Sequence, residues 1–109
     1  YIEIKNSKKL ADIFEKLNIP YVLGKVWTTD SMIRETVGLV ENRRKEGCIA
    51  VEMELAGVQA LCDFYGLELY DFLESGDVLE SSGYDIEGLH GANHNLGKLY
   101  IALETALFL

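Results

Sequence analysis

Residues 48–57 read CIAVEMELAG, and this stretch indicates the class of fold. An apolar run over 48–53 that follows a glycine is typical of a strand covered on both faces. The apolar spacing after it predicts a helix over 55–65, which Gly66 would end. Its buried stripe would comprise Leu55, Val58, Leu61, Cys62 and Tyr65. A buried strand that leads directly into a helix is the building unit of a parallel α/β sheet.

The same alternation extends towards the N-terminus. A helix is predicted over 7–17, with Asn6 or Ser7 as the residue whose side chain caps it. Pro20 cannot continue this helix. Aromatic and β-branched residues over 21–28 then indicate a strand. The buried face of the helix would comprise Leu10, Ile13, Phe14 and Leu17.

Further elements follow on both sides of the opening stretch. A helix over 35–46, ended by Gly47, has a thin apolar face and would lie on the surface. A third strand is predicted over 67–73 and a last helix over 96–107. The stripe of this helix would comprise Leu96, Leu99, Tyr100, Leu103 and Leu107. Strands that alternate with covering helices predict an α/β layered domain with a largely parallel sheet.

Length and charge limit the function classes. A chain of 109 residues with 49% apolar residues is expected to form a single domain over 1–109. Its net charge is −8, with only 10 Lys and Arg residues, which argues against a nucleic-acid partner. The basic cluster over 43–45 stands beside Glu41 and Glu46, so we interpret it as a solvated helix end.

Cysteine and histidine usage point to an ordinary intracellular chain. Cys48 and Cys62 lie in apolar runs and are interpreted as two buried thiols rather than a disulfide. His90 and His94 have a spacing that could bind zinc on a helix, but glycines surround them, so they are interpreted as polar loop residues and no metal is expected. No stretch is long and apolar enough to predict a membrane span, and a cytoplasmic location is expected.

Polar residues follow each predicted strand, over 28–30, 52–54 and 75–77. Open α/β sheets bind ligands at the carboxyl ends of their strands. Glu52 and Glu54 would point to the same side of an extended chain, and a carboxylate can accept both vicinal hydroxyls of a ribose. The alternative is that Glu54 caps the next helix.

Asp77 is the second candidate for chemistry. It follows the third predicted strand in a turn beside Gly76, where a carboxyl group with a raised pKa could act as a general acid. The alternative is a turn residue that hydrogen-bonds its own backbone.

Four short motifs occur in order: 24–30 reads GKVWTTD, 34–36 reads RET, 51–57 reads VEMELAG, and 76–77 reads GD. Together they resemble the purine nucleoside and uridine phosphorylase family, and the similarity extends over nearly all of the chain after residue 20. The resemblance implies a three-layer α/β/α domain, of which this chain would be the C-terminal portion. It also implies cleavage of the N-glycosidic bond of a nucleoside, with phosphate as the attacking group in the phosphorylases and water in the nucleosidases.

The resemblance also implies roles for individual residues. Glu54 matches the residue that holds the ribose 2′- and 3′-hydroxyls, and Met53 matches a thioether that faces the sugar and base. Glu52 matches a second residue near the base or ribose. Thr28 and Met32 fall where the family lines the base pocket.

Asp77 matches the acid that protonates the departing purine, which favours a purine nucleoside as substrate. The chain departs from the family pattern in having Gly76 where a serine is usual, and in having no arginine after Arg44 to support the acid. The family's phosphate-binding glycines and arginines belong to an N-terminal half, and no phosphate-cradling loop is evident in this sequence. We therefore expect the isolated chain to be inactive.

In the complete enzyme we expect ribosyl transfer from a purine nucleoside to phosphate, with phosphate as co-substrate and no cofactor. A nucleosidase that uses water and a catalytically inactive nucleoside-binding or assembly module remain as alternatives. The family is oligomeric, so a homo-oligomer is expected.

Overall fold

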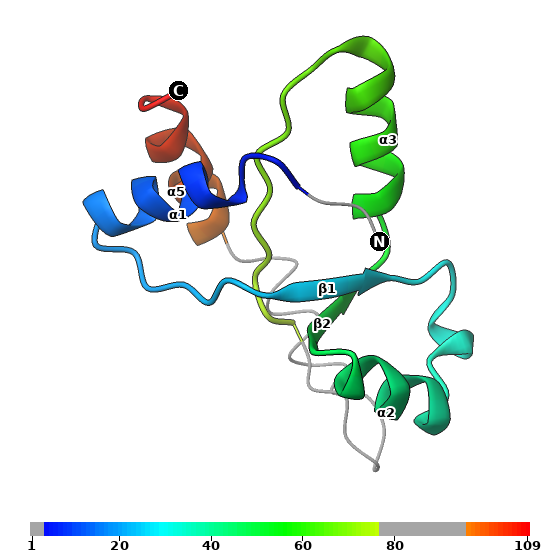
Figure 1. The fold of residues 1–109 in the computed structure, drawn as a ribbon. Helices are drawn as coiled ribbons and strands as arrows, with labels where there is room; N and C mark the ends of the chain where they lie inside the picture. The colour runs from blue at the N-terminus through cyan, green and yellow to red at the C-terminus, as the bar shows by residue number, and fades with distance from the viewer. Residues whose placement is uncertain (1–3, 77–95) are drawn as a thin grey trace.

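The computed structural model describes residues 4–76 and 96–109 (Figure 1). Its elements, in chain order, are α1 (Ser7–Lys16), β1 (Lys25–Thr28), the 3-10 helix η1 (Met32–Arg34), α2 (Val37–Lys45), β2 (Cys48–Glu52), α3 (Leu55–Tyr65) and α5 (Gly97–Ala106). The predicted helix over 55–65 has the predicted bounds, and the other three predicted helices agree within two residues at each end. Within the described ranges no helix is long and apolar enough to cross a membrane.

The strands β1 and β2 form a parallel pair, which confirms the predicted α/β class. The register sets Trp27 opposite Val51 and Thr28 opposite Glu52. The chain passes from one strand to the other through η1 and α2, the kind of crossover that parallel strands require. The carboxyl ends of both strands therefore meet at one edge.

Helix α1 buries the face that the sequence predicted, with Leu10, Ile13 and Phe14 inside. Its C-terminus is closed by a left-handed residue, Asn18 at φ 55°, and the N–H of Ile19 donates to the carbonyl of Phe14 at 2.9 Å. At the other end the predicted cap is wrong. Asn6 occupies the capping position, but its side chain makes no capping bond and donates to the carbonyl of Leu69 at 3.1 Å.

The predicted third strand over 67–73 is also wrong, since no strand forms there. A strand needs a neighbouring strand for its backbone hydrogen bonds, and this segment takes its contacts from α1 instead. The ring of Phe72 packs edge-on against Phe14 with centroids 5.5 Å apart. Lys9 donates to the hydroxyl of Tyr70 at 2.8 Å.

The first strand is shorter than the predicted 21–28, because the residues before Lys25 run towards α1. Tyr21 donates its hydroxyl to Glu15 at 2.9 Å and packs edge-on against Phe14. Gly24 then passes close to Ile49, whose Cδ1 would lie 2.3 Å from a β-carbon at that position.

The apolar stripes predicted to be buried on α3 and α5 are largely exposed, and none of their residues is buried. Leu61 on α3 is 57% exposed and Tyr100 on α5 is 68% exposed. Within each helix the one buried residue is polar, Gln59 in α3 and Thr105 in α5. The predicted burial fails because, within the described ranges, no element packs over these stripes.

Coverage of β2 is also incomplete, since Cys48 is buried but Ile49 is exposed. The prediction of a strand covered on both faces is therefore wrong for the described residues. Both cysteines are free thiols, as predicted, although Cys62 is only partly buried. Helix α2 has no buried residue, which confirms its predicted surface position.

Candidate functional site

The carboxyl ends of β1 and β2 bring two predicted site residues together. The Thr28 hydroxyl donates to a carboxylate oxygen of Glu52, its partner in the register. The N–H of Thr29 donates to the carbonyl of Glu52 at 2.9 Å. Asp77, at the third predicted strand end, lies outside the described residues. The ends of the two strands, with Thr28, Thr29 and Glu52, therefore lie together at this edge.

The start of α3 is capped by side chains from both strands. Oε2 of Glu52 accepts the N–H of Glu54 at 2.6 Å and also the N–H of Leu55. Oγ1 of Thr28 accepts the N–H of Ala56 at 3.2 Å. A carboxylate here is favoured by the helix dipole. Glu54 holds the capping position without a capping bond from its own side chain, so Glu52 has the role that the alternative gave to Glu54.

A shallow hollow of about 420 Å³ opens beside this junction. Its volume is in the range of small-molecule sites. Two predicted substrate residues, Thr28 and Met53, line it. The remaining lining residues are Trp27, Thr29, Asp30, Arg34, Leu39, Arg43 and Ala56. The hollow thus joins both strand ends to the loop and helix that connect them.

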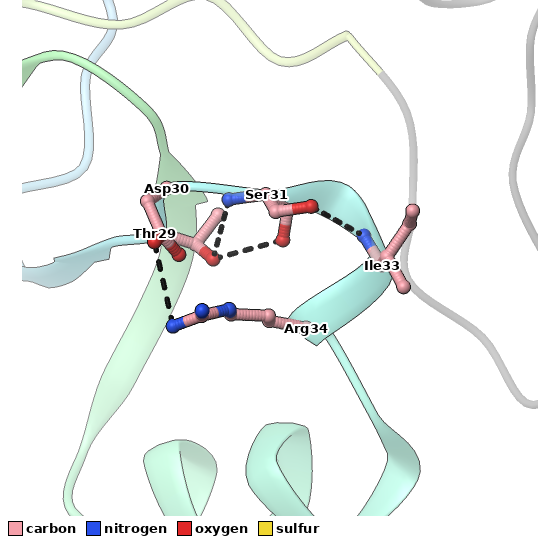
Figure 2. A network of polar contacts seen from close by, with 5 residues as sticks. All are labelled: Thr29, Asp30, Ser31, Ile33 and Arg34. Atoms are coloured by element: carbon pink, nitrogen blue, oxygen red, sulfur yellow. Dashed lines mark hydrogen bonds and ion pairs between the residues drawn. The ribbon is translucent and has the colours of Figure 1, made fainter.

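The loop after β1 is held by its own side chains, as Figure 2 shows. Thr29 is buried, and its hydroxyl donates to the carbonyl of Ser31 at 3.1 Å. The hydroxyl of Ser31 accepts the N–H of Ile33 at 3.3 Å. Arg34 lies 3.4 Å from the carboxylate of Asp30. These contacts shape one wall of the hollow from residues close in sequence.

The two arginines beside the hollow are both paired with carboxylates. Arg34 faces Asp30, and Arg43 contacts Glu46 at 3.0 Å. The first N–H groups of α3 are occupied by Glu52 and Thr28, as described above. An anion bound in this hollow would have to compete with these carboxylates. The arrangement is therefore better suited to an uncharged, hydroxyl-bearing or aromatic ligand than to phosphate.

Comparison with known proteins identifies the family. Residues 3–73 match the Phosphorylase superfamily. The chain belongs to this superfamily. It is similar to a protein named purine nucleoside phosphorylase DeoD-type from Alkaliphilus metalliredigens (strain QYMF), with 30% identity over 99 residues. That match covers 91% of this chain but only 42% of the relative, so the chain spans less than half of the relative's length. No solved structure matches the chain.

The superfamily match includes both strands, α3 and the whole hollow. Within this superfamily domain Met53 and Glu54 form the turn between β2 and α3, and both side chains are exposed. Met32 begins η1, but its side chain lies outside the described part of the chain. The structure therefore groups Thr28, Glu52 and Met53 directly, with Glu54 next to them in the chain.

The sequence did not single out the other groups at this site. Trp27 is a buried aromatic residue, 8% exposed, that also lines the hollow. Arg43 was assigned to a solvated helix end, but it lines the hollow at the strand ends. The crossover between parallel strands is the signal that could have placed it there.

Asp71 is a further carboxylate that sequence reasoning missed. It is half-buried, and this burial raises its pKa, with a smaller contribution from the negative charge of Glu52. Asp71 belongs to the segment predicted as a strand, so it was treated only as part of that element. The negative charge of Glu52 therefore acts on a second carboxyl group, which belongs to the segment after α3.

Proposed function

We propose that this chain carries the nucleoside-binding part of a phosphorylase-superfamily enzyme, as the C-terminal portion of its domain. In the complete enzyme this part would bind a purine nucleoside, and the ribosyl group of the nucleoside would be transferred to phosphate. The observation that carries the proposal is the β2–α3 junction. Glu52 caps the helix there, which leaves the exposed Glu54 side chain without a capping role. Glu54 directly follows Met53, which lines the hollow together with Thr28.

The proposed contacts follow from the chemistry of these groups. An ionised Glu54 can accept both ribose hydroxyls, and such charge-assisted bonds are stronger than neutral ones. Met53 offers a soft apolar surface to the sugar and base. Thr28 and Met32 are proposed to border the base. Glu52 holds Thr28 by a hydrogen bond at the same strand end.

The acid is proposed to be Asp77, which would protonate the base as it leaves. Positive charge grows on the sugar at the same time, so a nearby Glu54 carboxylate would stabilise the transition state. The name of the relative, a purine nucleoside phosphorylase, supports a purine substrate.

Phosphate is proposed to bind through residues outside this chain, as co-substrate and without a cofactor. The paired arginines and the capped start of α3 support this, since both use cationic or N–H groups that an anion would need. The purified chain is therefore expected to release no base from inosine, with or without phosphate. Phosphate-dependent release would contradict the proposed location of the phosphate site, and release without phosphate would favour a nucleosidase.

The sugar contact is tested by binding. We expect the chain to bind inosine more tightly than 2′,3′-dideoxyinosine, which lacks the two hydroxyls, and Glu54→Gln to reduce this preference about tenfold. Nuclear magnetic resonance titration of the purified chain measures both affinities. Glu41→Gln, which changes an exposed carboxylate on α2, is the matched control. An unchanged preference in Glu54→Gln would reject the ribose assignment.

A second candidate is a catalytically inactive binding or assembly module. The exposed stripes of α3 and α5 favour it, because exposed apolar patches of this kind mark interaction surfaces. A homo-oligomer formed through these helices is proposed on the same ground. The two free thiols support a reducing compartment such as the cytoplasm.

A further inference from the structure

The Glu52 carboxylate is fully used by groups of the protein. One oxygen accepts the hydroxyl of Thr28, and the other accepts the N–H groups of Glu54 and Leu55. A carboxylate whose two oxygens are both engaged in this way has little capacity left for a sugar or base. Its contacts instead join the last residue of β1, the end of β2 and the first turn of α3.

These contacts fix the backbone of the turn that carries Met53 and Glu54. The bond to the N–H of Glu54 spans only two residues, so it holds the main chain at the point from which the Glu54 side chain extends. Thr28 anchors the same carboxylate from the neighbouring strand and also accepts the N–H of Ala56. The position of the turn is therefore tied to the register of the sheet.

We propose that Glu52 is a positioning residue, which does not touch the nucleoside but orients Met53 and Glu54 towards it. This inference rests on the proposed function, because it gives Glu54 the ribose contact. It assigns Glu52 a role distinct from that of Glu54, although both are carboxylates of the same strand end. The distinction predicts different responses to the same kind of substitution.

Removal of the Glu52 carboxylate is the direct test. In Glu52→Ala the preference of the 109-residue chain for inosine over 2′,3′-dideoxyinosine should fall about tenfold, as in Glu54→Gln. The double variant with Glu54→Gln should lose no more preference than either single variant, because both act on one contact. Glu52→Gln should recover most of the preference, since its amide oxygen can still accept a backbone N–H. Glu41→Ala, on α2, serves as the matched control.

A second measurement does not depend on any ligand. Hydrogen exchange at the amides of Glu54, Leu55 and Ala56 should accelerate at least tenfold in Glu52→Ala and stay unchanged in Glu41→Ala. Unchanged exchange, or a retained inosine preference in Glu52→Ala when Glu54→Gln loses it, would overturn the positioning role. If the unsubstituted chain does not prefer inosine over 2′,3′-dideoxyinosine, the proposed function fails. The exchange rates alone then decide whether Glu52 holds the backbone of the turn.

Discussion

Helices α1 and α3 have similar lengths and carry apolar residues at similar spacing, yet only α1 buries its stripe. Phe14 on α1 is 6% exposed, whereas Tyr65 in the stripe of α3 is 65% exposed and Phe64, next to it in the chain, is 81% exposed. The difference comes from what surrounds each helix. Segments before β1 and after α3 bring Tyr21 and Phe72 against Phe14, and α5 contacts α1 as well.

Over α3 no such segment lies within the described ranges. Its Phe64 contacts the adjacent Tyr65 edge-on, but that ring is itself exposed. The comparison teaches that an amphipathic pattern specifies a helix and the face that favours burial. It does not specify the partner, which must come from elsewhere in the chain or from another chain.

The largest expected effect is on stability, when one phenylalanine of each helix is replaced. Phe14→Ala should lower the free energy of unfolding by about 3–5 kcal/mol, because it removes a buried ring and leaves a cavity. Phe64→Ala should change it by less than about 0.5 kcal/mol, as is usual for exposed positions. Urea unfolding followed by circular dichroism measures both variants.

Repeating these measurements at different protein concentrations tests whether a second copy covers α3. If α3 is covered by a second copy, Phe64→Ala should cost more stability at high concentration than at low, since association stabilises the folded state. Equal and large costs for both variants at every concentration would show that the α3 face is buried within the chain.

A smaller effect is expected at the ends of these two helices. Gly66 ends α3 at φ 66°, and Gly66→Ala should cost about 1–2 kcal/mol because a β-carbon is strained in the left-handed region. Asn18 ends α1 at φ 55°, and Asn18→Gly should be close to neutral, since glycine adopts that conformation without strain. Thermal unfolding of the two variants is the measurement. A neutral Gly66→Ala would mean that the end of α3 relaxes.

The smallest effect concerns Asp71, in the segment that runs from α3 to the face of α1. Burial and the Glu52 charge raise its pKa above the ordinary value of 3.8. A raised carboxyl pKa means that the folded state favours the protonated form, so stability falls as pH rises from the unfolded value through the folded one. Asp71→Asn should therefore be more stable than the unsubstituted chain at pH 7.

The pH dependence of that gain is the check. The melting temperatures of the two chains should converge below the ordinary pKa of Asp71, where the carboxyl group is protonated in both states. A gain that is the same at low and neutral pH would contradict the assigned cause.

Local signals were sufficient for much of the fold and part of the site. The four helices, the ends at Gly47 and Gly66, and the parallel pairing follow from apolar spacing, glycine conformation and the alternation of elements. The resemblance to the family pointed to Thr28 and Met53, and both line the hollow. The bond between Thr28 and Glu52 and the effect of the Glu52 charge on Asp71 join residues 24 and 19 positions apart in the chain, so spacing could not show them.

The sequence by itself determined which segments become helices and strands, because backbone sterics and side-chain periodicity act over a few residues. Only the tertiary structure decided which apolar stripe is buried, that residues 67–73 follow α1 rather than a strand, and that Glu52 rather than Glu54 caps α3. The first two depend on which distant group arrives to complete a hydrogen bond or cover a ring. The third involves bonds to the next residues of the chain, but the Glu52 carboxylate that makes them is also held by Thr28 from the neighbouring strand. That information lies in the arrangement of the elements and not in any one of them.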